Sequence, residues 1–329
     1  MQQRQLGQLS VSAVGLGCMG FTAVYGGHEE KASIATLHRA VELGVTLFDT
    51  AEVYGPYDNE QIVGRALRPF RDTVTIATKF GFAIGEEGIG FQRVTGVNGS
   101  PAQARSVAEA SLKRLGVDVI DLYYLHRPDP ATPIEETVAA MADLVREGKV
   151  REIGLSEVSA GQLRRAHAIH PIAALQSEYS LWTRDVERDI LPACRELGIS
   201  FVPYSPLGRG FLSGKIRGAE DFGENDFRAA QPRFTGDNLA ANLALVDRLQ
   251  AMGEARGVSA AQLALAWVLA QGEDVIPIPG ARRIEHLEAN IAAADLVLAP
   301  DDLAAIGAVM ADVQGPRYGE REMSIVGRD

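Results

Sequence analysis

Short apolar runs and longer amphipathic stretches alternate along almost the whole chain. The runs, such as Val45 to Phe48, have the length of buried strands and end at polar residues or glycines. The stretches between them repeat apolar positions every three or four residues, and one of them places Ile34, Leu37 and Val41 on one helical face. We expect no hairpin beyond the first few residues. The pattern therefore predicts repeated strand–helix–strand units and a parallel sheet.

Eight apolar runs qualify as strands of such a sheet, at residues 11–16, 45–48, 74–79, 119–125, 150–156, 173–176, 199–204 and 275–278. The expected helices cover about 29–41, 60–67, 101–115, 133–147, 159–169, 185–197, 239–256, 259–271, 283–294 and 301–312. Residues 4–9, with Gly7 in the middle, have the composition of a short hairpin, and a polar tail follows the last helix.

Eight strands in a chain of 329 residues are typical of a (β/α)8 barrel. The predicted fold class is therefore α/β: a (β/α)8 TIM barrel with a short N-terminal β-hairpin and additional C-terminal helices. We expect a single domain over residues 1–329. A doubly wound sheet is the alternative, but no stretch supplies its phosphate-binding fingerprint.

The segment Gly15-Leu16-Gly17-Cys18-Met19-Gly20 is a literal match to the G-x-G-x-x-G pattern. In a dinucleotide-binding sheet this pattern opens directly into a helix, whereas here residues 21–27 precede the next helix. We interpret the match as a decoy for that fold. We expect its glycines to let a ligand approach the backbone instead.

Composition narrows the class of protein. The chain is 46% hydrophobic and 23% charged, as soluble globular proteins are, and no apolar run reaches the ~18 residues of a membrane span. Cys18 and Cys194 are too few for a disulfide framework, and the N-terminus does not resemble a signal peptide, so we expect a cytoplasmic protein. A net charge of −11 argues against a nucleic-acid partner, but it permits a local pocket for one phosphate group.

Polar side chains stand at the carboxyl ends of six of the eight expected strands. These are Asp49, Lys79, His126, Ser156, Gln176 and Tyr204, and Tyr54 follows in the loop after Asp49. In a TIM barrel these strand ends converge on the face where the chemistry takes place. A phenol ionises only near pH ~10, so a working tyrosine acid needs a cation nearby, and Lys79 is the candidate.

Two loops have the composition of a phosphate site. They read Ser205-Pro206-Leu207-Gly208-Arg209-Gly210 and Pro279-Gly280-Ala281-Arg282-Arg283, after the seventh and eighth expected strands. Glycines there expose backbone N–H groups, and arginines supply paired donors. Each loop alone could equally be a tight turn beside a solvated basic face. Together, opposite the polar strand ends, they suggest a large phosphorylated cofactor.

These residues resemble the aldo-keto reductase family over nearly the whole chain. The matching segments, in the family's order, are Gly15-Leu16-Gly17, Phe48-Asp49-Thr50-Ala51-Glu52-Val53-Tyr54-Gly55, Thr78-Lys79, Leu125-His126-Arg127-Pro128-Asp129, Gly154-Leu155-Ser156 and Tyr204-Ser205-Pro206-Leu207-Gly208. The stretch from Tyr204 to Lys215 resembles the microbial and plant branch, which lacks the long C-terminal substrate loop.

The resemblance implies a barrel that binds NADP(H) across its C-terminal face and reduces carbonyl compounds. Tyr54 would be the general acid, Lys79 would lower its pKa, and Asp49 would hold Lys79. His126 would orient and polarise the carbonyl group. Hydride delivery builds negative charge on the carbonyl oxygen, which a phenol, an imidazole and a nearby ammonium stabilise.

The same resemblance assigns the cofactor contacts. Ser156 and Gln176 would hold the carboxamide, Tyr204 would stack on the nicotinamide ring, and Arg282, Arg283 and His286 would lie near the 2′-phosphate. The full implied set is Gly17, Cys18, Met19, Asp49, Ser156, Gln176, Tyr204, Ser205, Pro206, Leu207, Gly208, Arg209, Gly210, Ile278, Gly280, Arg282, Arg283, His286 and Asn290.

Two positions depart from the family pattern. Glu157 stands where many relatives carry asparagine, and a carboxylate can accept from the carboxamide NH2 but cannot donate to its oxygen, so we leave it out of the site. In Leu287-Glu288-Ala289-Asn290, alanine replaces a glutamate that often meets the adenine. The role of Trp182 stays open between a wall of the carbonyl pocket and a packed core aromatic.

The predicted function is NADPH-dependent reduction of aldehydes and ketones to alcohols. The alternative is a nicotinamide-binding regulatory barrel with little turnover. A metal- or phosphate-dependent lyase or isomerase is a third reading, but the chain lacks a carboxylate cluster to hold a cation, and we expect no metal. We expect a small-molecule carbonyl substrate and no nucleic-acid or membrane partner. The natural substrate depends on loops 19–28, 80–100 and 208–236, and the oligomeric state stays open.

Overall fold

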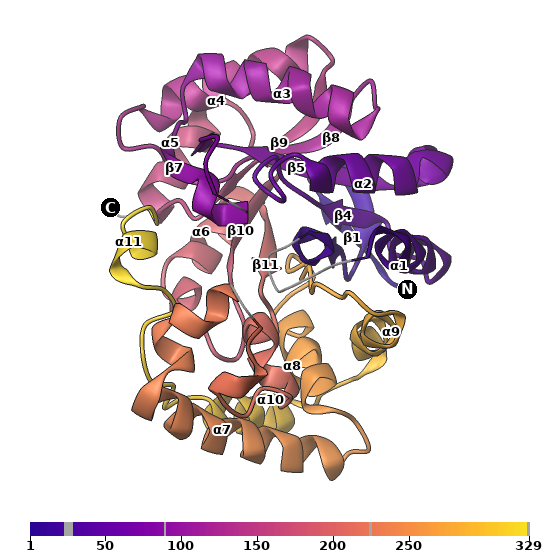
Figure 1. The fold of residues 1–329 in the computed structure, drawn as a ribbon, viewed down its shortest axis with the longest axis vertical. Helices are drawn as coiled ribbons and strands as arrows, with labels where there is room; N and C mark the ends of the chain where they lie inside the picture. The colour runs from indigo at the N-terminus through magenta and orange to yellow at the C-terminus, as the bar shows by residue number, and fades with distance from the viewer. Residues whose placement is uncertain (23–28, 89, 224–225, 328–329) are drawn as a thin grey trace.

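The computed structural model describes residues 1–22, 29–88, 90–223 and 226–327. Seven parallel strands form one curved sheet with helices around it (Figure 1). In sheet order they are β3 (Leu16–Gly17), β4 (Leu47–Asp49), β5 (Thr75–Phe80), β8 (Ile120–Leu125), β9 (Val150–Ser156), β10 (Ala174–Glu178) and β11 (Ser200–Tyr204). Residues 23–28, 89 and 224–225, in the three loops expected to shape the substrate pocket, lie outside the described residues.

The segment 275–280 closes the barrel between β11 and β3. The amide of Ile276 donates to the carbonyl of Phe201 (2.8 Å), and the amide of Gly15 donates to the carbonyl of Pro277 (3.0 Å). The expected strand at 275–278 is nevertheless irregular, because Pro277 and Pro279 lack the N–H that a regular ladder toward β3 requires. The predicted (β/α)8 barrel is confirmed, with its eighth position filled by this proline-containing segment.

Helices surround the sheet as the hydrophobic pattern predicts. They are α1 (Glu30–Glu42), α2 (Asp58–Leu67), α3 (Pro101–Leu115), α4 (Ile134–Arg146), α5 (Ala160–Ile169), α6 (Ile190–Leu197), α7 (Gly236–Glu254), α8 (Ala260–Leu269), α9 (Ile284–Ala292), α10 (Pro300–Val309) and α11 (Glu320–Met323). Sequence signals set several bounds. The Ser100 side chain caps α3 and Gly116 ends it in a left-handed conformation, while Ser159 and Ser259 form capping boxes with the third residue of α5 and α8.

Three local predictions were wrong. The expected strand 11–16 is split, because β2 (Leu9–Ser12) pairs with β1 (Gln3–Leu6) as the second arm of the N-terminal hairpin, and only β3 enters the barrel. A second hairpin, β6 (Phe82–Ile84) with β7 (Val94–Val97), folds within the glycine-rich connection after β5. The expected helix 185–197 is a short turn followed by α6. The single domain over residues 1–329 stays a prediction.

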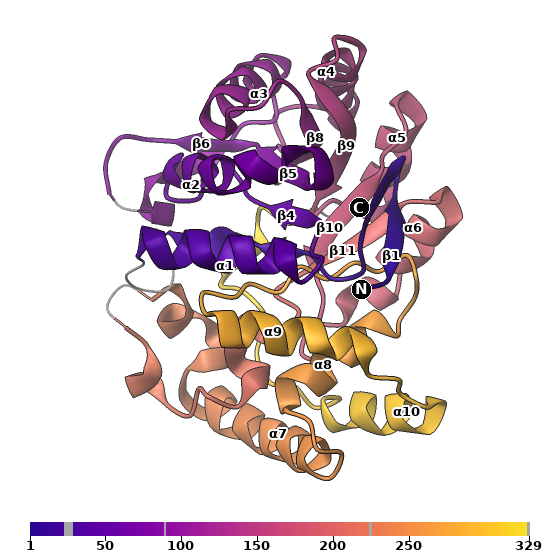
Figure 2. The same ribbon diagram turned by 90° about the vertical axis from the view of Figure 1, so that its right-hand side faces the viewer.

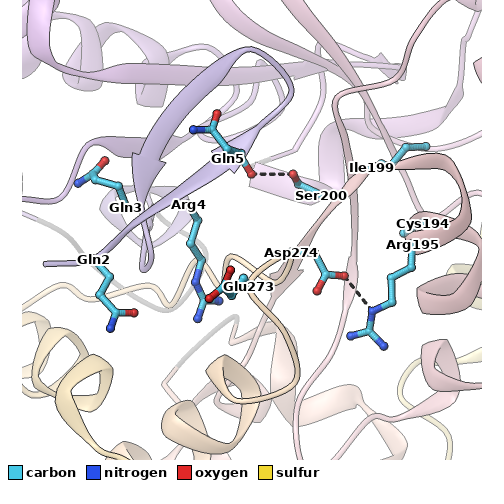
Figure 3. Close-up of a pocket in the computed structure, with 11 residues that line it drawn as sticks. Gln2, Gln3, Arg4, Gln5, Cys194, Arg195, Ile199, Ser200, Glu273 and Asp274 are labelled. Atoms are coloured by element: carbon cyan, nitrogen blue, oxygen red, sulfur yellow. Dashed lines mark hydrogen bonds and ion pairs between the residues drawn. The ribbon is translucent and has the colours of Figure 1, made fainter.

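The N-terminal hairpin covers the end of the barrel opposite the strand C-termini (Figure 2). Leu6 and Val11 are fully buried there, in one cluster with barrel-interior residues of β4, β5 and β8. Arg4 is one of the residues that line an open groove of about 680 Å³ (Figure 3). Its guanidinium donates to the carbonyls of Leu269 (3.1 Å) and Gly272 (3.0 Å). These bonds tie the hairpin to the end of α8. We therefore assign this groove a structural role, as is usual for the N-terminal face of a barrel.

Gly64 tests the packing of α2 against α3. A Cβ atom there would overlap the carbonyl oxygen of Leu115, a backbone atom that cannot rotate away. We expect Gly64→Ala to lower the free energy of unfolding by about 1–3 kcal/mol, despite the ~1 kcal/mol that alanine gains in a helix. Urea denaturation measures the change. Gly96→Ala is the control, because a Cβ atom there meets nothing within 4 Å. Equal stability of the two variants would contradict the packing argument.

Candidate active site

The parallel register brings the predicted polar residues to one end of the barrel. Asp49 ends β4, Lys79 lies near the end of β5, and Ser156 ends β9 beside Gln176 of β10. His126 directly follows β8. All of these side chains are buried, so the site lies within the C-terminal mouth of the barrel rather than on its surface.

Lys79 is the centre of the polar contacts in this mouth. Its ammonium group is fully buried and forms an ion pair with Asp49. The same nitrogen donates to the carbonyl of Thr50 (2.9 Å) and to Oη of Tyr54 (3.3 Å). An ammonium group has three N–H donors, so these three acceptors satisfy it completely. The phenol of Tyr54 is therefore held against a cation, as the sequence predicts.

Asp49 is fixed on both of its oxygens. Oδ1 accepts from Lys79, and Oδ2 accepts from Nε2 of Gln176 at 2.8 Å. A chain of contacts therefore runs from the amide of Gln176 through the carboxylate and the ammonium to the phenol. Because these residues come from three different strands, closure of the barrel is what assembles them.

The pKa of Tyr54 differs from the sequence expectation in its direction. Burial and then the Asp49 carboxylate raise the pKa of Tyr54 well above its ordinary value, while burial lowers the pKa of Lys79. The net shift is upward because burial and the Asp49 carboxylate outweigh the opposing effect of the nearby Arg127 cation. Tyr54 consequently keeps its proton at neutral pH, which is the form that a general acid requires.

His126 is a neutral ring beside Tyr54. Burial, followed by the charges of Lys79 and Arg127, lowers the pKa of His126 well below its ordinary value. Its ring lies 5.9 Å from that of Tyr54 and 4.8 Å from that of Phe82, measured between centroids. Its buried Nδ1 has no hydrogen-bond partner among the described residues. A tautomer with the proton on Nε2 leaves that nitrogen free to donate to a ligand.

Tyr54 also belongs to an apolar wall of the site. It consists of Ala51, Val53, Tyr54 and Phe82, packed against Met19, Ile84, Phe91, Val94, Val97 and Ile325. The β6–β7 hairpin and the C-terminal tail supply most of these residues. The sequence analysis expected the loop at 80–100, which contains this hairpin, to shape the pocket. It did not predict that Ile325 of the C-terminal tail packs against the cluster that contains Tyr54.

The tail also contributes a buried ion pair that the sequence analysis missed. Both guanidinium NH2 groups of Arg317 donate to Glu157, at 2.8 Å and 2.6 Å. The amide of Gly327 donates to the backbone carbonyl of Glu157 at 2.7 Å, and Oη of Tyr204 donates to its side chain at 2.9 Å. Glu157, left out of the predicted site, thus links the tail to the tyrosine expected to stack on the nicotinamide. Its unusual residue type beside Ser156 was the only available signal.

Arg209 has a different partner from the one expected. Its guanidinium donates to Glu178 (2.6 Å) and to the carbonyl of Arg317 (2.9 Å), and it lies over the ring of Tyr318 at 4.3 Å. The sequence analysis expected this arginine to supply paired donors to a phosphate group. Because Glu178 balances its charge, the backbone of the loop is the more available donor. Ser205, Gly208, Arg209 and Gly210 all have positive φ, which gives this loop its tight curvature.

The glycines of the decoy motif lie against protein. A Cβ atom on Gly17 would come 2.8 Å from the carbonyl oxygen of Ile278, and one on Gly15 would come 2.9 Å from the Ile278 side chain. They allow the barrel-closing segment, rather than a ligand alone, to approach the backbone of β3. The amide of Cys18 donates to the carbonyl of Asp49 at 2.8 Å, so this turn also holds the end of β4 in place.

The basic residues expected near a 2′-phosphate lie at the start of α9. Arg282 and Arg283 are exposed, and Nζ of Lys215 lies 2.9 Å from Nε2 of His286. Burial and the Lys215 charge lower the pKa of His286. Lys215 comes from a loop about seventy residues earlier, which is why sequence spacing did not assign it. Glu288 is paired with Arg39, and Asn290 is buried on α9.

Trp182 is a packed core aromatic, the second of the two roles left open. Its ring is 3% exposed and lies 4.1 Å from that of Phe211 and 5.2 Å from that of Phe234. Within the described residues no group of three or more His, Cys, Asp and Glu side chains could hold a metal ion. In the same part of the chain no helix is long and apolar enough to cross a membrane.

The chain is similar to a curated protein and to solved structures. The model of the Aldo/keto reductase family matches residues 13–311. A curated "Probable aldo-keto reductase 1" from Glycine max is 50% identical over 312 residues, which cover 94% of this chain and 88% of that protein. The solved glycerol dehydrogenase AKR11B4 from Gluconobacter oxydans is 31% identical with a TM-score of 0.85, covering 97% of this chain and 98% of its own. A thermostable aldo-keto reductase, Tm1743, solved with the inhibitor epalrestat, is 28% identical with a TM-score of 0.74, covering 94% of this chain and 100% of its own.

The Glu157–Arg317 pair predicts a pH-dependent loss of stability. Burial alone would raise the pKa of Glu157, but Arg317 holds it at about 2. Because this pKa is lower than the ordinary 4.5, the stabilisation is complete above about pH 4.5 and is lost as the pH falls through about 2. Arg317→Met leaves a buried carboxylate unpaired, so we expect a loss of about 3–5 kcal/mol at neutral pH.

Urea denaturation at neutral pH and near pH ~3 tests this, because Glu157 in the variant can take up a proton in acid and the loss should shrink. The double variant Glu157→Gln with Arg317→Met should be more stable than Arg317→Met alone. Arg188→Met is the control, since the Arg188 side chain is 87% exposed. A loss that does not change with pH would contradict the ion-pair assignment.

Proposed function

The chain belongs to the aldo-keto reductase family, and from that premise we propose that it reduces aldehydes and ketones to alcohols with NADPH. The family consists of oxidoreductases that act on small carbonyl compounds with a nicotinamide cofactor. The observation that carries the proposal is the buried contact of the Tyr54 phenol with Lys79, which is held in turn by Asp49. His126 stands beside the phenol as a neutral hydrogen-bond donor.

In this mechanism Tyr54 is the general acid. NADPH, when bound, supplies the hydride to the carbonyl carbon. The carbonyl oxygen gains negative charge as this happens, and Tyr54 donates its proton to it. The ammonium of Lys79, 3.3 Å from the phenol oxygen, stabilises the negative charge left on Tyr54. His126 orients and polarises the carbonyl oxygen from the other side.

The residues proposed to hold NADP(H) fit a long phosphorylated ligand. Ser156 and Gln176 would exchange their present bonds, to Arg127 and Asp49, for the carboxamide. Tyr204 would stack on the nicotinamide. The backbone of residues 205–210 would meet the pyrophosphate, with Gly17, Cys18, Met19, Ile278 and Gly280 along the same face. Arg282, Arg283, His286 and Lys215 would surround the 2′-phosphate, and Asn290 would meet the adenine.

Tyr54→Phe tests proton transfer, because it removes one oxygen and keeps the ring's volume. We expect reduction of an aromatic aldehyde to fall by at least ~10²-fold, the usual contribution of a general acid, with NADPH affinity nearly unchanged. Loss of NADPH absorbance measures turnover, and fluorescence quenching measures affinity. Tyr57→Phe is the matched control. Normal turnover by a folded Tyr54→Phe protein would refute this role. Absent turnover in the wild type, with NADPH bound, would support a regulatory barrel instead.

Cofactor preference tests the basic group at α9. A 2′-phosphate that meets Arg282, Arg283 and Lys215 should favour NADPH over NADH by about 1–3 kcal/mol, the scale of a few charge-assisted hydrogen bonds. We expect Arg283→Ala to weaken NADPH binding and to leave NADH binding unchanged, measured as dissociation constants. The exposed Arg188→Ala variant is the control. Equal affinity of the wild type for both cofactors would contradict the assignment of these residues.

A further inference from the structure

Among the described residues, Arg127 has no ion-pair partner of its own, unlike three other buried cations at this end of the barrel. Lys79 is paired with Asp49, Arg209 with Glu178, and Arg317 with Glu157. Within the described residues no carboxylate lies within ion-pair distance of Arg127. The carboxylate that acts on Arg127 is that of Glu157, which is already paired with Arg317, so a ligand carboxylate could bind Arg127 directly.

Arg127 lies beside the candidate active site. It follows His126, and its Nη1 donates to the carbonyl of His126 (2.7 Å) and to Oγ of Ser156 (3.3 Å). Both acceptors are uncharged. Its guanidinium carbon lies 5.9 Å from the centre of the Tyr204 ring. Nε and Nη2 form no hydrogen bond with a described residue, so one edge of the planar group is available to a ligand.

The positive charge of Arg127 acts on the pKa values of both His126 and Tyr54. Burial first, then Lys79, then Arg127 lower the pKa of His126. Burial and Asp49 raise the pKa of Tyr54, and Arg127 acts in the opposite direction. A charge that acts on both side chains lies beside the space where a carbonyl group would sit. The contacts with Ser156 and Tyr204 put Arg127 at the nicotinamide end of the expected cofactor. The basic residues of α9 are expected at its other end, near the 2′-phosphate.

We propose that Arg127 binds a carboxylate group of the carbonyl substrate, so that the preferred substrates are small aldehydes or ketones that carry a carboxylate. The inference rests on the proposed carbonyl-reductase function. The free edge of a guanidinium matches the two oxygens of a carboxylate. One unit of negative charge neutralises Arg127, whereas a phosphate dianion would leave excess charge near Glu157 and Glu178. The apolar wall around Tyr54 fits the hydrocarbon part of such a molecule.

Turnover with two related aldehydes tests the preference. We expect the wild type to reduce 4-carboxybenzaldehyde with a kcat/KM about 10- to 100-fold above that for its methyl ester, the range that a charge-assisted contact provides. Arg127→Met should bring this ratio close to one, and Arg127→Lys should restore part of it. Arg188→Met, an exposed arginine, should keep the wild-type ratio. A wild-type ratio near one, or a ratio unchanged in Arg127→Met, would overturn the inference.

Binding to the NADP⁺-loaded protein separates this inference from the proposed function. Calorimetry should show benzoate binding at least about 10-fold tighter than benzamide in the wild type, and no difference in Arg127→Met. This result would stand even if neither aldehyde were reduced, in which case only the proposed function would fail. If Arg127→Met instead weakens NADP⁺ binding and the protein does not distinguish benzoate from benzamide, Arg127 is a cofactor contact and the inference is wrong.

Discussion

The fully buried ammonium of Lys79 is the constraint on which the rest of this site depends. Removing that charge from water is costly, and only a complete set of partners makes it tolerable. The structure provides that set through Asp49, the carbonyl of Thr50 and the phenol of Tyr54. Gln176 then fixes the second oxygen of Asp49. Since these partners come from separate strands and a loop, the barrel must close in the correct register before Tyr54 has a defined position.

A second buried ion pair fixes the tail over the same mouth. Breaking the Glu157–Arg317 pair would leave a carboxylate unpaired, which costs more than the pair itself contributes. The main effect of the pair is therefore to fix the position of the C-terminal tail, rather than to add net stability. It holds the segment that brings Ile325 to the apolar wall, and through Tyr204 it reaches the expected nicotinamide site. Beside these balanced charges, Arg127 is a described cation that has no carboxylate within ion-pair distance.

Most of the fold could be predicted, because local signals govern it. The helix expected at 101–115 coincides with α3, since Ser100, Pro101 and Gly116 mark its ends. The failures occurred where neighbours in space override local pattern. The apolar run 11–16 reads as one strand, but pairing with β1 takes its first half into the hairpin. The run at 275–278 reads as a strand too, yet its prolines leave only part of a ladder.

The sequence by itself determined the family, the barrel and the residues at its strand ends, because parallel strands deliver their C-terminal residues to one face whatever the details of packing. Only the tertiary structure decided which charges meet. Arg317 lies 160 residues from Glu157, and no periodicity connects them. The pKa of Tyr54 likewise follows from burial and from Asp49, which the sequence does not measure. Ion pairing and burial are properties of the folded chain, so the sequence pattern could not predict the ion-pair partners or the direction of the pKa shifts.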